Sequence, residues 1–245
     1  MWLFGSAAQV GAFAFQALAL ANGLLSVVQP LLATELVFML VLRKIWIRQS
    51  IPAVAWGAAA LACVSLTVFL ISGEPIGGRS TPASHHWLGA VLACCAAATV
   101  LMLASRRGAP GIRAALAAAG CGTMWALVAT FIKATTETVT DFGVLGMFTH
   151  WPVYALVVGS VVALVLQQAA LHVGPLRASQ PFLVIVDPIV SIILGVWLYE
   201  EHFTTDAGVL ATAAVAFGVL CLAIVLLTQT TPATMSADHP RRMTT

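Results

Sequence analysis

The chain has 245 residues, of which 60% are hydrophobic and only 8% charged, and its mean hydropathy is +0.99. Soluble domains carry roughly 25% charged residues, so this composition excludes a soluble globular protein and predicts an integral membrane protein. The balance of 11 basic against 9 acidic residues lacks the basic excess of a nucleic-acid-binding protein. The five cysteines stand in apolar stretches without metal-ligand spacing, which indicates small packing residues.

Eight apolar runs are long enough to cross a bilayer, for which a helix needs about 20 residues. Polar or Pro/Gly-rich breaks separate them, and they cover approximately 1–21, 24–42, 53–72, 87–104, 114–134, 151–170, 176–199 and 207–228. The first run has neither the basic start nor the cleavage pattern of a signal peptide. The sequence therefore predicts an all-α polytopic membrane bundle of about eight transmembrane helices.

The eleven basic residues divide unevenly when the loops are assigned to alternating sides of the membrane. Nine fall on one side: Arg43, Lys44, Arg48, Arg106, Arg107, Arg113, Arg177, Arg241 and Arg242. The other side receives Arg79, Lys133 and six acids: Glu74, Glu137, Asp141, Glu200, Glu201 and Asp206. The six acids and His85-His86 are interpreted as a solvated loop face, with attraction of cations at an external mouth as the alternative. Because cytoplasmic loops carry the excess of Lys and Arg, we expect a multi-pass protein of the plasma (inner) membrane with both ends of this chain in the cytoplasm.

The second and seventh runs resemble each other. L-S-V-V-Q-P-L-L-A-T-E-L-V-F has an echo in L-R-A-S-Q-P-F-L-V-I-V-D-P-I-V, with Gln29-Pro30 matching Gln180-Pro181 at an offset of 151 residues. The second copy lies five runs after the first, an odd number, so it crosses the membrane in the opposite sense, as in inverted-repeat transporters. We expect a first repeat over 1–104, a cytoplasmic linker over 105–113, a second repeat over 114–228 and a polar cytoplasmic tail over 229–245.

These stretches resemble the drug/metabolite transporter (DMT) superfamily, particularly its actinobacterial EamA-like members, over nearly the whole chain. The resemblance implies a ten-helix inverted-repeat fold and solute export, and a related nine-helix branch comprises magnesium transporters. The repeat offset maps the sixth run onto the first. It would map the fifth run onto a helix before the first run, and the sequence shows none there. This chain is therefore expected to lack the family's first helix, which in the family lines part of the central cavity.

Two carboxylates lie deep within the predicted membrane helices, Glu35 in the second run and Asp187 in the seventh. A charge at the bilayer centre costs on the order of 3 kcal/mol, so such residues normally face a cavity or a partner. No Lys or Arg is expected at that depth to pair with them. We therefore predict that both bind the substrate or a coupling ion, either a proton or a divalent cation. Protonated carboxyls that bind a neighbouring helix are the alternative.

Glutamines and prolines supply the remaining candidates. A proline inside a helix removes a backbone hydrogen bond and kinks or interrupts the helix, and three are expected to do so: Pro30, Pro181 and Pro188. Freed carbonyls beside a glutamine amide make a polar lining for a small solute. The candidate substrate-binding glutamines are Gln16, Gln29, Gln167 and Gln180. Gln168 is a further candidate for the cavity lining, and interhelical hydrogen bonding is the favoured alternative for Gln16, Gln167 and Gln168.

The leading functional hypothesis is a secondary transporter that exports a small metabolite or drug-like solute by alternating access, without a cofactor. The chain has no G-x-x-x-x-G-K-[ST] phosphate loop and no H-E-x-x-H or G-x-S-x-G motif, which argues against ATP hydrolysis and against an enzyme. The alternatives are a permease for magnesium or another divalent cation and a non-transporting membrane subunit. Its partners would be the bilayer and a small-molecule or ion substrate, with a homodimer left open.

Overall fold

The computed structural model describes residues 2–46, 48, 50–73, 75–78, 82, 84–204 and 206–230. Within them the chain is an all-α polytopic bundle, and seven helical spans are long and apolar enough to cross a membrane. The stretch Gly11–Asn22 of the first helix is also apolar but shorter. The predicted fold class is confirmed. Glu74, Arg79, Arg241, Arg242 and the tail from 231 lie outside the described residues.

The helices follow the apolar runs closely. They are α1 (Trp2–Asn22), α2 (Leu25–Leu32), α3 (Glu35–Trp46), α4 (Ala53–Gly73), α5 (Ser84–Ala104), α6 (Pro110–Gly146), α7 (Trp151–Val173), α8 (Leu176–Leu198) and α9 (Ala207–Thr230), with a short 3-10 turn η1 (Met147–Thr149) before α7. Proline stands in the first turn of α6 and of α7, where its missing N–H costs nothing.

The second apolar run forms two helices instead of one. After Pro30, the backbone N–H groups of Ala33 and Thr34 bond three residues back, each at 3.1 Å, and the Thr34 hydroxyl donates to the Leu31 carbonyl at 2.7 Å. These bonds end α2, and α3 begins at Glu35. The expected interruption is found here.

The other two prolines do not break their helix. Helix α8 continues through both Pro181 and Pro188. No hydroxyl follows Pro181 closely, and the hydroxyl of Ser191 after Pro188 donates to Asp187 at 3.2 Å instead of to the backbone. Nothing therefore competes with the helical hydrogen bonds beyond each proline. Of the two expected effects, an interruption is therefore wrong at these two positions, and a kink stays a prediction.

The fifth run is also longer than predicted, because α6 starts at Pro110, inside the expected linker, and continues to Gly146. Its 37 residues span roughly 55 Å at 1.5 Å per residue, more than a hydrocarbon core of about 30 Å. Its last turns therefore lie beyond the core, and Glu137 and Asp141 stand on a helix instead of in a loop. At Gly143 the backbone leaves helical geometry with φ 74°.

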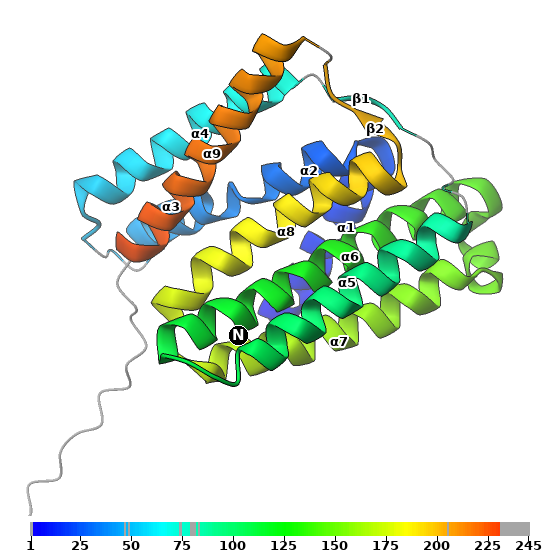
Figure 1. The fold of residues 1–245 in the computed structure, drawn as a ribbon, viewed down its shortest axis with the longest axis horizontal. Coiled ribbons are helices and arrows are strands. Elements are labelled where there is room, and N and C mark those ends of the chain that lie inside the picture. Colours follow the sequence, from blue (N-terminus) through cyan, green and yellow to red (C-terminus); the bar gives the residue numbers. More distant parts are fainter. Residues whose placement is uncertain are drawn as a thin grey trace, which may run out of the picture.

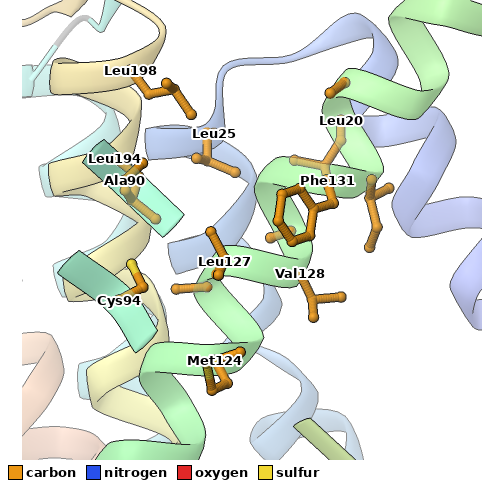
Figure 2. Close-up of a cluster of buried hydrophobic side chains, with 14 of the residues drawn as sticks. Leu20, Leu25, Ala90, Cys94, Met124, Leu127, Val128, Phe131, Leu194 and Leu198 are labelled. Atoms are coloured by element: carbon orange, nitrogen blue, oxygen red, sulfur yellow. The ribbon is translucent and has the colours of Figure 1, made fainter. Parts of the chain in front are cut away.

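The helices pack in two groups. The α6 group comprises α1, α2, α5, α6, α7 and α8, whose buried side chains converge around α6; Figure 2 shows Leu20, Leu25, Leu127, Phe131 and Leu194 meeting there. The α4–α9 group comprises α3, α4 and α9, and Figure 1 shows α4 and α9 apart from α5 and α7, with α8 between them. Many of its buried residues are alanines, which let membrane helices approach closely.

A small antiparallel ribbon joins two connections. Strand β1 (Ile76–Gly77) pairs with β2 (Glu201–His202), with Gly77 opposite Glu201, and Thr204 N–H donates to the Gly73 carbonyl at 3.2 Å. The α4–α5 and α8–α9 connections therefore lie at the same end of the bundle, as alternating loops require. We call this the ribbon end.

Candidate functional site

A buried ion pair lies at the ribbon end, at the start of α2. The carboxylate of Glu201 accepts hydrogen bonds from the backbone N–H groups of Leu25 at 2.7 Å and Ser26 at 2.9 Å. Its Oε1 also lies 3.1 Å from the ammonium of Lys133 on α6. Glu201 is completely buried and Lys133 is 7% exposed. The sequence prediction that Glu201 belongs to a solvated loop face is wrong, and Lys133, assigned to the same side of the membrane, is buried with it.

The remaining contacts of Lys133 are also polar or aromatic. Its ammonium donates to the Gly23 carbonyl at 3.3 Å and lies 4.5 Å from the ring centroid of Tyr199. The Tyr199 hydroxyl donates to the Thr130 carbonyl at 2.9 Å. Glu201, Lys133, Tyr199 and the first N–H groups of α2, which we call the Glu201 cluster, thus bond α2, α6 and the end of α8 to one another.

Local backbone explains why the cluster forms. Helix α2 has no side-chain N-cap at Leu24, so its first N–H groups need an acceptor from elsewhere. A carboxylate suits this position because a helix N-terminus attracts negative charge. Gly195 on α8 leaves the space for it, since a Cβ there would overlap Glu201 Oε2.

In the same first turns of α2, two buried polar side chains have no partner within the described residues. Ser26 is completely buried and Gln29 is 2% exposed, yet the Ser26 hydroxyl and both amide atoms of Gln29 make no hydrogen bond within the described part of the chain. Residues three apart share a helix face, so we call this pair the Ser26–Gln29 face. Burying such groups without a partner costs roughly 2–7 kcal/mol each by transfer, and the bilayer interior offers no water to satisfy them.

The two predicted carboxylates lie near the α2–α3 break. Glu35 is the first residue of α3 and is exposed on the isolated chain, whereas Asp187 on α8 is half-buried. Asp187 accepts the Ser191 hydroxyl at 3.2 Å and interacts electrostatically with Glu35. The structure therefore brings together carboxylates from the second and seventh runs, where the α4–α9 group meets α8.

The other predicted glutamines do not join this region as a set. The Gln167 amide oxygen accepts a hydrogen bond from the Trp125 indole at 3.2 Å, which ties α7 to α6 and corresponds to the interhelical alternative. Gln16 is half-buried on α1, and Gln180 is exposed on α8. No group of three or more His, Cys, Asp or Glu side chains arranged to hold a metal occurs among the residues described.

Comparison with known proteins gives one relative of unassigned function. An uncharacterized protein of Corynebacterium glutamicum (strain ATCC 13032) is 27% identical to this chain over 243 residues, which cover 98% of this chain and 83% of that protein. No family model and no solved structure matches the chain. The resemblance to drug/metabolite transporters therefore stays a prediction.

Proposed function

We propose that this protein is a secondary transporter that exports a small polar or cationic solute across the membrane by alternating access. The observation that carries the proposal is the Ser26–Gln29 face, where a buried amide and a buried hydroxyl lack partners among the residues that the structure describes. A solute that supplies those hydrogen bonds would remove a desolvation cost that the unliganded protein bears. Buried polar groups within membrane spans commonly mark substrate pathways.

The packing supports a mechanism in which the two helix groups rock against each other. The second run is divided between the α6 group and the α4–α9 group at the α2–α3 break, and α8, a member of the α6 group, also packs against the α4–α9 group. Interrupted helices beside a binding site are a recurrent feature of such transporters. In this proposal the Glu201 cluster holds the ribbon end closed while the opposite end gives access to the Ser26–Gln29 face.

The carboxylates give the proposal an ion-coupled form. The Glu35 carboxylate lies close enough to Asp187 to act on it electrostatically across the α2–α3 break, so a proton or a cation bound there would alter how the two helix groups dock. The same observation favours a second candidate, a magnesium permease, because Mg²⁺ is commonly held by one or two carboxylates and its own waters.

A ligand screen on detergent-purified protein tests the proposal. Amino acids, nucleosides, organic cations and Mg²⁺ are compared for their effect on the melting temperature, since a ligand at 100 times its Kd stabilises the folded state by about 2.7 kcal/mol. We expect an organic solute to stabilise wild type and Gln168→Leu, an exposed glutamine control, but not Gln29→Leu. The same solute should show counterflow in proteoliposomes.

Two results would contradict the transporter proposal for this site. A stabilising solute whose effect survives in Gln29→Leu would place its binding elsewhere, and a bound solute without counterflow would make the protein a binding subunit. If Mg²⁺ alone stabilises wild type and Asp187→Asn abolishes the shift, the permease replaces the solute transporter.

A further inference from the structure

A separate cavity of about 270 Å³ opens at the ribbon end, between the first turns of α5 and α7 and the last turns of α6. Its lining combines the carboxylates of Glu137 and Asp141 with the rings of Trp87, Phe142 and Trp151. The volume lies just below the range of roughly 300–1,000 Å³ that is usual for drug-sized ligands. The space therefore suits a small molecule.

The two carboxylates supply the negative charge of the cavity. Burial raises the pKa of Glu137 to about 7, so its full charge is present only above that pH. Glu137 and Asp141 are four residues apart on α6, so they project from one face and repel each other. The charges of Lys133 and Glu201 also act on Glu137. The Lys133 ammonium, however, forms its ion pair with Glu201, at 3.1 Å. No ion pair of Glu137 or Asp141 with a basic side chain is present among the residues that the structure describes.

The aromatic rings give the cavity its walls. Trp87 and Trp151 meet edge to face with their centroids 4.9 Å apart, and Phe142 stacks on the His150 ring at 4.4 Å. The faces of Trp and Phe rings carry negative potential and attract cations, with Trp the strongest. Carboxylates and indoles in one small cavity thus favour the same kind of ligand, one with positive charge and apolar surface.

The chemistry of the lining distinguishes an organic cation from a metal ion. Ca²⁺ takes six to eight oxygen ligands, whereas the rings offer none. The lining histidine, His150, has its Nδ1 within 3.0 Å of both the Gly146 carbonyl and the Thr149 hydroxyl. No metal-ligand group of three was found in the described part of the chain.

We propose that the cavity formed by Glu137, Asp141, Trp87, Phe142 and Trp151 is a binding site for a small organic cation of the alkylammonium class. This site is separate from the Ser26–Gln29 face, and its existence does not depend on transport. Because Glu137 stands one turn from Lys133 on α6, a bound cation would lie next to the Glu201 cluster.

Equilibrium dialysis with radiolabelled tetraethylammonium tests the site on the full chain in detergent micelles. We expect saturable binding that Glu137→Gln weakens about tenfold or more, because a charge is lost at close range. Trp151→Leu should weaken it about fivefold through loss of a cation–π contact. The matched control is Asp206→Asn, which removes a carboxylate at the ribbon end outside the cavity. In wild type Asp206 accepts a hydrogen bond from the Gly208 N–H at 2.8 Å, and the asparagine amide oxygen can still accept it.

Melting temperatures of all variants, measured without ligand, show that each one folds. The proposal is contradicted if tetraethylammonium does not bind, if Asp206→Asn weakens binding as much as Glu137→Gln, or if Mg²⁺ competes with tetraethylammonium as well as tetramethylammonium does. It also fails if Asp187→Asn, and not Glu137→Gln, removes the binding, because the cation would then occupy the region near the α2–α3 break. The proposal is supported if Glu137→Gln and Trp151→Leu both weaken the binding of tetraethylammonium and Asp187→Asn does not change it.

Discussion

Two stretches of α2, less than one turn apart, treat buried polar atoms in opposite ways. At the helix start, the Glu201 carboxylate satisfies two backbone N–H groups and the Lys133 ammonium. At the Ser26–Gln29 face, three buried polar atoms have no partner within the described residues. Ser26 belongs to both, since its N–H is bonded and its hydroxyl is not. We infer from this contrast that the Glu201 cluster holds helices together and that the Ser26–Gln29 face is a ligand site.

The largest expected effect comes from breaking the Glu201 cluster. Glu201→Leu leaves the Lys133 ammonium buried without a counter-charge and two helix N–H groups without an acceptor, so we expect a loss of about 3–5 kcal/mol in the free energy of unfolding. Lys133→Met should cost less, because Glu201 keeps its two N–H donors. SDS titration of the purified protein measures both. Equal losses in the two variants would contradict the capping role of Glu201.

A crowding change at the same place should have an intermediate effect. Gly195→Ala adds a Cβ that overlaps Glu201 Oε2, and overpacking of this kind typically costs about 1–3 kcal/mol. Gly57→Ala is the matched control, because nothing lies within 4 Å of its Cβ position on α4; it should be neutral or stabilising by up to about 1 kcal/mol. A Gly195→Ala protein as stable as Gly57→Ala would show that α8 and α2 are not closely packed.

The smallest effect is expected for Tyr199→Phe. The change removes the hydroxyl that donates to the Thr130 carbonyl at 2.9 Å and retains the ring beside Lys133, so the loss should be about 1 kcal/mol. The melting temperature in detergent reports it. A loss as large as that of Glu201→Leu would mean that the hydrogen bond, and not the ion pair, dominates the cluster.

Hydropathy predicted most of the fold because a bilayer fixes how long an apolar helix must be. Helix α4 was expected over 53–72 and is found at Ala53–Gly73. The last turns of α6 were missed because hydropathy treats Glu137 and Asp141 as loop residues. Helix formation tolerates them, and there Thr138 and Thr140 bond back to carbonyls four residues earlier at 2.8 and 3.0 Å.

The candidate site was only partly predictable. Gln-Pro pairs at matching positions of the predicted repeat, and carboxylates at nearly corresponding positions, led to Glu35, Asp187 and Gln29. The Lys133–Glu201 pair was missed because its members are 68 residues apart in the sequence and each stands at the edge of an apolar run, where a solvated charge is the ordinary expectation. The packing of α2 decides whether the buried Gln29 amide has a partner. The sequence around Gln29 does not contain that information.

The most direct test of the contrast needs no ligand. Gln29→Leu replaces an unpaired buried amide with an apolar side chain of similar size, so unliganded protein should gain stability, by about 1–3 kcal/mol if the full desolvation cost is recovered. The measurement is the free energy of unfolding of Gln29→Leu against wild type by SDS titration. A gain is the predicted result. A loss of similar size would show that the Gln29 amide has a structural partner and would contradict the assignment of the Ser26–Gln29 face as a ligand site.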